Sequence, residues 1–395
     1  MGGVSMEWKE VRLGDIVSIK SGLAYKGAFI GKGENILLGM GCVSFKDKFL
    51  FSGARPYEAD CDDKYCVEPG DIVLATRQQS DNLPILAMPA IIPSSLKAKK
   101  IIYGTNLYKV ENHSEVTNDF LFWQLKTPDY IDYISSVKTG SVVRMVTKKN
   151  VEDYVFRCPP KEVRDRISKL LWGLDRKIEL NNKINADLEE MAQAIFKNWF
   201  VDFEPFKDGK FVDSELGMIP EGWKVGLLGE ICNFKRGKNL LTKNAIDEGV
   251  PVVAGGLEPS CYHNVANTGA PVITVSGSGA NAGFMRMYHI PVWASDCSFI
   301  DISCENFYFV YCFLKVNSKL LKHAQTGAVQ PHVKPSDIHD FELVIPDKES
   351  IFDFQDKVKP FFDKIAAIQK ENSRLSLLRD TLLPRLMSGE LEVPE

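Results

Sequence analysis

Four stretches of the sequence carry lysine and arginine but no carboxylates, a pattern that suits contact with a polyanion. They span residues 82–110, 133–151, 259–295 and 306–336. Such stretches can neutralise phosphates along a nucleic-acid backbone, although the net charge of −4 by itself disfavours that partner. For any one stretch, a solvated basic surface without a ligand is the alternative. Because the stretches recur at matching places in the two halves of the chain, nucleic-acid binding stands as a hypothesis beside it.

Two short motifs add candidate contacts to bases. Arg77-Gln78-Gln79 follows the apolar run 71–76, and arginine and glutamine suit bidentate hydrogen bonds to guanine and adenine. The glycine-rich segment 277–283 would offer backbone amides and small side chains. Its spacing differs from that of a dinucleotide-binding loop and a strand pattern follows it, so a β-turn is the interpretation we favour. Surface turns often carry such residues without any ligand.

The predicted DNA-binding residues come from these stretches and motifs and from the segments that precede them in each half. Lysines after a repeated Thr-Gly motif, such as Lys148, are expected at the phosphate backbone. The complete set is Lys20, Ser21, Arg77, Gln78, Gln79, Lys97, Lys99, Lys100, Arg144, Lys148, Lys149, Arg236, Lys238, Ser278, Asn281, Arg286, Gln330, His332 and Lys334.

Signatures of catalysis are missing from the sequence. It contains no phosphate-binding P-loop, no Asn-Pro-Pro-aromatic or Asp-Pro-Pro-aromatic tetrapeptide of amino-methyltransferases, no nucleophile elbow and no H-E-x-x-H. The nine cysteines include no C-x-x-C pair, and no histidine stands at zinc spacing. We therefore expect no catalytic residue and no metal site, with the cysteines as reduced thiols.

Two long helical segments must position the candidate residues. Apolar residues recur in steps of three and four over 159–206 and again from 346 towards the C-terminus. About 40 residues at ~1.5 Å each give a rod of ~60 Å, which needs a partner. Two rods with the same seam bury it best by packing antiparallel. The predicted seams are Ile167, Leu171, Leu174, Ile178, Leu188, Met191 and Ile195, and Phe354, Val358, Phe361, Ile365, Leu375, Leu378 and Leu382.

The chain repeats one unit, a globular part followed by a helix. Residues 8–22 match residues 223–237, and residues 139–154 match residues 326–341. Short β-branched runs between turn residues predict mostly β globular parts, with a helix at 118–126 and its counterpart at 305–323. The fold class is therefore α+β, with two similar mostly-β domains separated by two long antiparallel helices in an internal pseudo-twofold repeat. The predicted domains are 1–158, 159–206, 207–345 and 346–395.

Aromatic residues gather where the first long helix ends, at Phe196, Trp199, Phe200 and Phe203. Packing between the helix and the second globular part is the first interpretation. A docking patch for a partner protein is the alternative. No stretch approaches the ~18 apolar residues of a membrane span, and the start MGGVSMEWKE has no signal region. We therefore expect a cytoplasmic protein, with Met1 or Met6 as its start.

Five longer motifs of the sequence carry a resemblance to a known family. They are IPEGWKVGLLGEI, TGSVV…VEDYVFRCPP, TGAVQPHVKPSDIHDFELVIP, MAQAIFKNWFVDFEP and LLPRLMSGELEV. With them, nearly the whole chain resembles the specificity (S) subunits of type I restriction-modification systems. In that family each globular part is a target recognition domain for one half of a split DNA site, and the helices carry methyltransferase subunits. The first copy departs from the usual motif, with Val143-Arg144-Met145 where the second has Gln330-Pro331-His332.

The resemblance implies a non-catalytic subunit that binds double-stranded DNA and two methyltransferase subunits, and restriction or translocase subunits through the complex. S-adenosylmethionine, ATP and Mg²⁺ would be bound by those partners, so we expect no cofactor in this chain. The alternative is a coiled-coil scaffold whose two β domains bind proteins. Salt-dependent binding to duplex DNA would distinguish the two.

Overall fold

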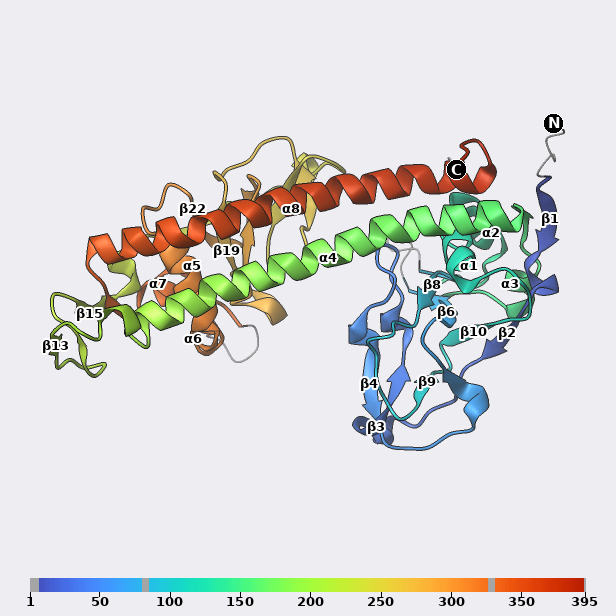
Figure 1. Ribbon diagram of the computed structural model, residues 1–395, viewed down its shortest axis with the longest axis horizontal. Coiled ribbons are helices and arrows are strands. Elements are labelled where there is room, and N and C mark those ends of the chain that lie inside the picture. The colour runs from blue at the N-terminus through green and yellow to red at the C-terminus, as the bar shows by residue number, and fades with distance from the viewer. Residues whose placement is uncertain (1–6, 80–84, 326–330, 394–395) are drawn as a thin grey trace. The chain divides into compact units, whose positions relative to one another are not determined.

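The computed structural model describes residues 7–79, 85–325 and 331–393, and the chain divides into two compact units. Unit 1 comprises residues 1–178 and 373–395, and unit 2 comprises residues 179–372. Two long helices, α4 (Lys161–Phe200) and α8 (Lys348–Ser388), each contribute one part to unit 1 and the other part to unit 2 (Figure 1). The four predicted domains cut the chain differently, at the ends of the helices, and stay predictions.

Unit 1 is built from short, mainly antiparallel strands. Strand β1 (Lys9–Arg12), near its start, pairs with β12 (Val155–Cys158), which precedes the first long helix. The central sheet has the order β2 (Val17–Ser21), β10 (Leu107–Asn112), β6 (Ile72–Ala75), β8 (Pro89–Ile91). A second sheet has the order β4 (Ala54–Tyr57), β3 (Ile30–Leu38), β9 (Ile101–Tyr103), β5 (Cys66–Val67), in which β3 and β9 are parallel. Its helices are α1 (Asn118–Gln124), α2 (Pro128–Val137) and α3 (Lys148–Glu152).

Unit 2 repeats this plan with a smaller second sheet. The equivalent pair is β15 (Lys224–Leu227) with β23 (Glu342–Ile345). The central sheet is β16 (Lys235–Arg236), β22 (Cys297–Asp301), β19 (Val272–Ser276), β20 (Met285–Tyr288), and the second is β18 (Cys261–His263), β17 (Val250–Val253), β21 (Trp293–Ala294). The remaining elements are a hairpin, β13 (Phe211–Val212) with β14 (Ile219–Pro220), and α5 (Phe307–Val316), α6 (Ser318–His323) and α7 (Pro335–His339).

Equivalent backbone hydrogen bonds show that the two units share one frame. In unit 1 the N–H of Leu13 donates to the carbonyl of Tyr154 at 2.7 Å. In unit 2 the N–H of Leu228 donates to the carbonyl of Phe341 at 2.8 Å. These are the residues that the sequence repeat pairs with each other, so the α+β class with two similar mostly-β parts is confirmed.

The shorter helices are more numerous than the sequence predicted. The expected helix at 118–126 is α1, but α2 follows it at once, because Thr127 caps the new helix and accepts a hydrogen bond from the N–H of Tyr130 at 3.3 Å. Pro128 occupies the first helical turn, where its missing N–H is not needed. The single helix expected at 305–323 is wrong, since the chain breaks at Asn317 into α5 and α6.

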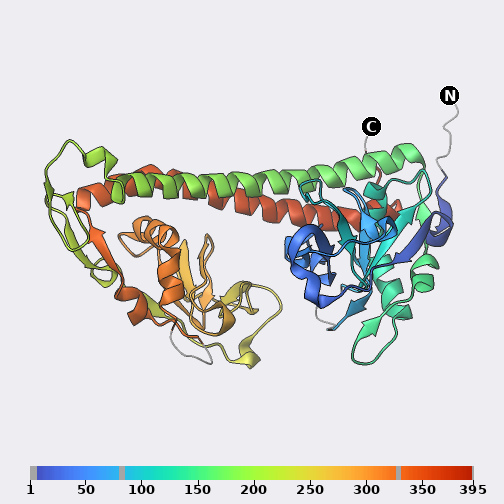
Figure 2. The ribbon, with the colours of Figure 1, turned by 90° about the horizontal axis from the view of Figure 1, so that it is seen from below.

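The long helices α4 and α8 pack antiparallel within each unit, as the shared seam predicted. In unit 1, Arg379 Nη1 donates to Asp175 Oδ1 at 2.6 Å. In unit 2, Asn181 Nδ2 donates to Asn372 Oδ1 at 2.8 Å. Residues later in α4 thus meet residues earlier in α8, and the two helices lie side by side (Figure 2). This part of the fold prediction is confirmed.

Two of the predicted seam residues are exposed. Met191 and Leu378 point to solvent, whereas Ala192 and Leu383, one and five positions further on, are buried. A straight α-helix has 3.6 residues per turn. Side chains that recur in alternating steps of three and four therefore do not stay on one face but shift gradually around the helix. Each helix also packs against the globular part of unit 1 over one portion of its length and against that of unit 2 over the other. The buried stripe follows those contacts.

The Asp175–Arg379 pair offers a test of the packing in unit 1. The Asp175 side chain is 5% exposed and that of Arg379 13% exposed, and Lys48 Nζ lies 3.8 Å from the same carboxylate. Asp175→Ala would remove the buried carboxylate that Arg379 and Lys48 share and leave Arg379 with the exposed Asp380, so we expect a loss of about 2 kcal/mol in the unfolding free energy. Urea unfolding followed by tryptophan fluorescence measures it.

Asp165→Ala is the matched control on the same helix, because it removes the exposed Lys161–Asp165 pair. Its expected effect is below about 0.5 kcal/mol. Equal effects of the two variants would show that burial of the Asp175 pair contributes nothing.

Candidate nucleic-acid interface

In unit 1 the segment that follows the Thr-Gly motif crosses the turn after β6. Two short strands form there, β7 (Arg77–Gln78) and β11 (Arg144–Met145). Arg144 lies opposite Gln78, and Met145 lies opposite Arg77. The structure therefore brings together two predicted stretches that lie far apart in the sequence.

The backbone conformation explains why the Thr-Gly motif contains a glycine. Gly140 has φ +92°, and a Cβ there would overlap the carbonyl oxygen of Val143. Only glycine adopts this conformation without strain. The Arg144 guanidinium donates to the Gly140 carbonyl, so the glycine also helps to orient one of the predicted DNA contacts.

Helix α3 adds two lysines to this surface. Its Glu152 accepts a hydrogen bond from the backbone N–H of Ile19 at 2.9 Å. That contact holds α3, with Lys148 and Lys149 in its first turn, against strand β2, which ends in Lys20 and Ser21. In the described part of the chain, no carboxylate lies within ion-pair distance of either α3 lysine, so both are available to a phosphate.

Two other predicted cations of unit 1 are engaged by carboxylates. Lys20 Nζ lies 3.3 Å from Glu111. Lys100 Nζ lies 2.9 Å from Asp60 and 3.0 Å from Asp63, and these hydrogen bonds raise the pKa of the Lys100 ammonium. A phosphate would have to compete with these partners.

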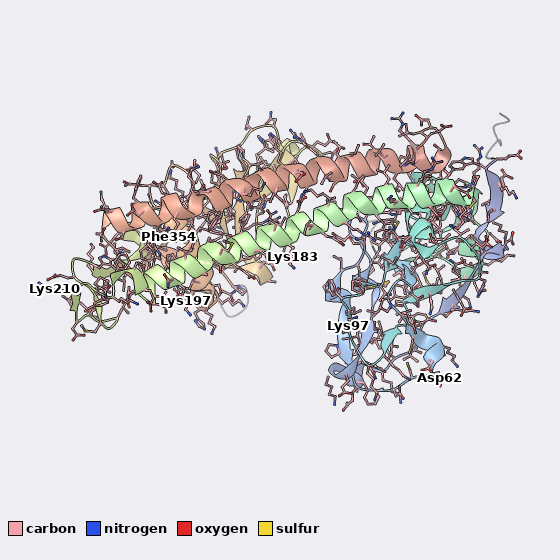
Figure 3. The ribbon with its side chains drawn as sticks, viewed as in Figure 1. Asp62, Lys97, Lys183, Lys197, Lys210 and Phe354 are labelled. Atoms are coloured by element: carbon pink, nitrogen blue, oxygen red, sulfur yellow. The ribbon has the colours of Figure 1, made fainter. Side chains whose placement is uncertain are left out.

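Lys97 and Lys99 differ from Lys100, because no described carboxylate lies within ion-pair distance of either. Figure 3 labels Lys97, which lies apart from the acidic segment around Asp62. Lys97 therefore keeps its charge for a phosphate contact, whereas Lys99, after the hydrogen bond from Lys100, contributes to the lowered pKa of Asp60.

Gln78 has a structural role in the turn. Its side chain is 4% exposed, and its Oε1 accepts the backbone N–H of Leu86 at 3.1 Å. A direct base contact by Gln78 would require this bond to break. Its neighbours Arg77 and Gln79 are exposed.

Unit 2 assembles its predicted residues at the equivalent place. Ser278 forms a β-bridge with His332 across the same crossing, while Gln330 lies outside the described residues. A hollow of about 450 Å³ is lined by Arg236, Gly277, His332, Lys334, Pro335 and Ser336.

One acidic residue belongs to this site and was not predicted. Asp296 forms an ion pair with Arg236 and accepts a hydrogen bond from the Ser278 hydroxyl. It directly follows the acid-free stretch 259–295, and sequence reasoning that searched for basic residues passed over it.

The other predicted residues of unit 2 lie around the glycine-rich segment. Residues Gly279–Asn281 form a 3₁₀ turn after β19, and Asn281 Nδ2 donates to the Gly255 carbonyl at 3.3 Å. Arg286 Nη1 donates to the Leu257 carbonyl at 3.0 Å and lies 3.4 Å from Glu258. Lys238 is exposed beyond β16. The glycine-rich segment is thus a turn, the interpretation favoured from the sequence. The side chains of Asn281 and Arg286 hold the loop 255–258.

The aromatic residues at the end of α4 are packed in the core of unit 2. Phe196 is 2% and Phe200 7% exposed, and Trp199 and Phe203 are partly buried. Phe354 of α8, labelled in Figure 3, packs against two of them, with ring centroids 5.7 Å from Phe196 and 5.2 Å from Phe200. This burial favours the packing interpretation for Phe196 and Phe200, and docking of a partner there stays a prediction.

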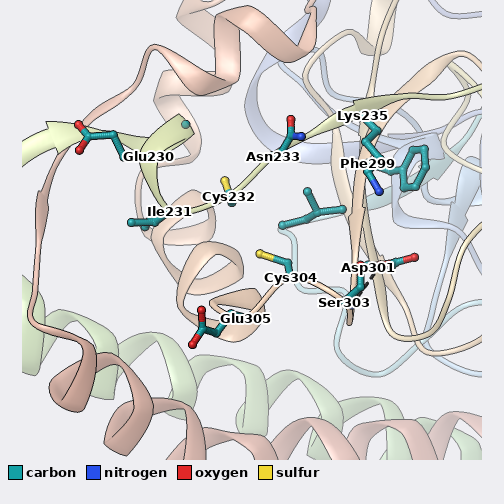
Figure 4. Close-up of a pocket in the computed structure, with 12 residues that line it drawn as sticks. Glu230, Ile231, Cys232, Asn233, Lys235, Phe299, Asp301, Ser303, Cys304 and Glu305 are labelled. Atoms are coloured by element: carbon teal, nitrogen blue, oxygen red, sulfur yellow. Dashed lines mark hydrogen bonds between the residues drawn. The ribbon is translucent and has the colours of Figure 1, made fainter.

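A second hollow of about 410 Å³ lies in unit 2, between the turn before β16 and the end of β22 (Figure 4). Burial raises the pKa of the Cys232 and Cys304 thiols that line it. Burial would also raise the pKa of Asp301, but hydrogen bonds from Ser303 and Gly269 outweigh it and lower that pKa. Protonated thiols are poor nucleophiles, so this hollow does not resemble a catalytic site.

Across residues 7–79, 85–325 and 331–393, no group of three or more His, Cys, Asp and Glu side chains is placed to hold a metal ion. Over the same ranges no helix combines the length and apolarity needed to cross a bilayer.

Comparisons with known proteins agree on one family. The model of the type I restriction modification DNA specificity domain matches residues 6–190 and again 220–376. The MjaIX specificity subunit of Methanocaldococcus jannaschii is 30% identical over 71% of this chain and 70% of its own length. The HindI specificity subunit of Haemophilus influenzae is 25% identical over 98% of this chain and all of its own length.

A solved structure agrees at the level of the fold. The type I restriction-modification S subunit from M. genitalium superposes with a TM-score of 0.52 at 17% identity, over 98% of each chain. Two matches of the family model to one chain agree with the repeated frame described above.

Lys148 and Lys149 provide a test of the phosphate assignment. Lys148→Ala with Lys149→Ala should weaken binding about equally for all duplex sequences, because phosphate contacts carry no sequence information. The slope of log K against log salt should fall by up to about 1.8, at ~0.9 per phosphate contact. Fluorescence anisotropy over a salt series measures both quantities.

Lys161→Ala is the control, because Lys161 is paired with Asp165 on α4, and it should leave the slope unchanged. A loss confined to the best-bound sequence would instead identify Lys148 and Lys149 as base contacts.

Proposed function

The chain belongs to the family of type I restriction-modification DNA specificity subunits, and we propose that each of its two units reads one half of a bipartite DNA target. One observation carries the proposal. The units share one backbone frame, yet they present different side chains where the segment after the Thr-Gly motif, as far as it is described, meets the turn after the central strand. Unit 1 presents Arg77 and Arg144 there, and unit 2 presents Arg236 and His332.

The arrangement of charges supports a division of labour within each unit. Lysines without a paired carboxylate, such as Lys148 and Lys334, would bind phosphates and fix the position of the unit on the duplex. Side chains at the crossing would contact base edges, where arginine recognises guanine and amides recognise adenine. A surface of this kind needs no catalytic group.

Catalysis would reside in partner subunits. A methyltransferase that modifies adenine has to extrude the base from the stack and supply S-adenosylmethionine. Translocation and cleavage would need ATP and Mg²⁺, again on partner subunits. The relatives described above are named as specificity subunits, and we extend that non-catalytic role to this chain.

The long helices would dock the methyltransferase subunits and hold the spacing of the two half-sites. Both carry large apolar side chains on their solvent-facing sides, which a docked subunit would cover. The exposed side chains are Leu180, Met191, Phe352, Leu377 and Leu378. Two recognition units within one chain favour two methyltransferase copies.

A domain exchange tests the central proposal. Replacing residues 8–158 with the corresponding part of another family member should change one half of the methylated sequence and leave the other half intact. Sequencing the methylome of a host that expresses the chimera with its modification subunit gives the result. If both halves changed together, independent recognition units would be the wrong description.

The partner assignment has its own test. Mass photometry of the purified chain with the modification subunit of its system should give a complex with two modification subunits per chain. The chain alone should bind duplex DNA weakly. A chain that forms no stable complex, or binds protein partners but shows no salt-dependent affinity for duplex DNA, would favour a protein-binding scaffold.

A further inference from the structure

The two units differ at one small site whose backbone is the same in both. In unit 1 the N–H of Gly22 donates to the carbonyl of Leu107 at 3.2 Å. In unit 2 the N–H of Gly237 donates to the carbonyl of Cys297 at 2.8 Å. The residues just before these glycines, Ser21 and Arg236, therefore occupy equivalent positions.

A second pair of hydrogen bonds extends the equivalence across the sheet. The N–H of Thr76 donates to the carbonyl of Asn106 at 3.0 Å. The N–H of Gly277 donates to the carbonyl of Asp296 at 3.1 Å. Three positions thus differ together, and we call them the junction set: Ser21, Thr76 and Asn106 in unit 1, and Arg236, Gly277 and Asp296 in unit 2.

In unit 2 the side chains of the junction set depend on one another. Arg236 Nη2 donates to Asp296 Oδ1. The guanidinium lies directly over Gly277, so that a Cβ added there would overlap Nη1 of Arg236. A side chain at position 277 would therefore displace the guanidinium from its present place. In unit 1 the smaller Ser21 stands in place of the arginine, and the position of Gly277 is held by Thr76, which is buried.

Asp296 uses both of its carboxylate oxygens. Oδ1 accepts from Arg236 and Oδ2 accepts from the hydroxyl of Ser278. Its negative charge is thus compensated, and the carboxylate holds one end of the guanidinium in place. Because a held guanidinium loses less conformational entropy on binding, Asp296 pre-organises Arg236.

The rest of Arg236 remains available to a ligand. Its side chain is 45% exposed, and it lines the hollow that His332 and Lys334 share. A guanidinium has five N–H donors in a planar fork, so donors remain after the contact to Asp296. Guanine presents two acceptors, N7 and O6, in the major groove, and arginine is their commonest bidentate partner.

We propose that Arg236, oriented by Asp296, recognises a guanine in the half-site of unit 2. Asp296 is the positioning residue. The proposal rests on the proposed function and adds to it a base, a specific side chain and the reason why that side chain is held. The two half-sites should therefore differ at the equivalent base, because unit 1 has Ser21 at this position.

Unit 1 places its own exposed arginine elsewhere. Arg77 lies opposite Met145, as Ser278 bridges to His332 in unit 2. Arg77 and Ser278 therefore occupy equivalent positions, as Ser21 and Arg236 do. Each unit has an arginine at one of these two positions and a serine at the other. The same frame thus aims a guanidinium from a different strand in each unit.

The experiment measures base preference with the chain in complex with its modification subunits. A duplex library randomised in one half-site at a time is selected by binding and sequenced, and the methylome gives an independent record. Arg236→Ala should lower the preference for guanine at one position of one half-site by roughly ten- to hundredfold. Asp296→Asn should relax the preference at that same position, and the other half-site should be unchanged.

Further variants separate a reading role from charge and from folding. Arg236→Lys keeps the charge but loses the bidentate fork, so it should not restore the preference. Gly277→Ala keeps Arg236 and displaces its guanidinium, and should relax the same position. If single variants fold poorly, Arg236→Ser with Gly277→Thr and Asp296→Asn installs the junction set that unit 1 already accommodates. Lys334→Ala is the control, with a loss that is equal for all sequences.

Three outcomes would overturn the inference. An equal loss for every sequence with Arg236→Ala would make Arg236 a phosphate contact. A change in both half-sites would indicate a general structural effect. A preference unaltered by Arg236→Ala would show that no base is read there. If the unaltered complex showed no sequence preference at all, the proposed function itself would fail.

Discussion

The antiparallel pairing of α4 and α8 is the interaction on which both units depend. Neither unit closes its core with one helix. In unit 1, Ile167 of α4 and Leu386 of α8 lie in the same buried cluster as Phe120 of α1. In unit 2, Phe196 of α4 and Phe354 of α8 belong to the cluster that contains α5. A seam of apolar side chains on a long helix is stable only when such a partner covers it, so each recognition unit is completed by residues from both helices.

Polar pairs inside this seam specify how the helices align. Asn181 with Asn372 and Asp175 with Arg379 are two contacts that exist in one register only. Buried polar pairs stabilise less than apolar packing would, but a slipped register would leave their donors and acceptors unpaired. Apolar side chains alone would tolerate a shift by one turn more readily. Contacts of this kind therefore make the alignment of the helix pair a single, defined state.

Sequence reasoning succeeded where local patterns decide the structure. The repeat alignment paired Leu13 with Leu228 correctly because each begins the same turn and each donates the same hydrogen bond. The long helices and their direction followed from the apolar seam. It failed where packing decides: Met191 has the right spacing but faces solvent, and Asn317 divides a predicted helix. These outcomes depend on neighbours from distant segments.

The candidate site shows the same limit more sharply. Basic residues could be predicted because composition alone marks them. Asp296 could not, because its importance arises from pairing between β16 and β22, which sets it beside Arg236 and Ser278. Gln78 was predicted from its residue type, but the structure buries its side chain against Leu86. Which polar side chains face a ligand is decided by strand pairing, and residue types do not reveal that pairing.

Steric coupling within the junction set limits how the specificity of unit 2 can change. With a Cβ at position 277, the Arg236 guanidinium could not keep its present place, since both would occupy the same space. Without Asp296 the guanidinium would lose the hydrogen bond that holds it there. Single substitutions in the junction set therefore weaken base recognition, and only a combination of substitutions can create a new base preference. Unit 1 holds a different, mutually compatible set on the same backbone. On this frame, a change of base preference requires exchanging the set as a whole, while the hydrogen bonds beneath it stay as they are.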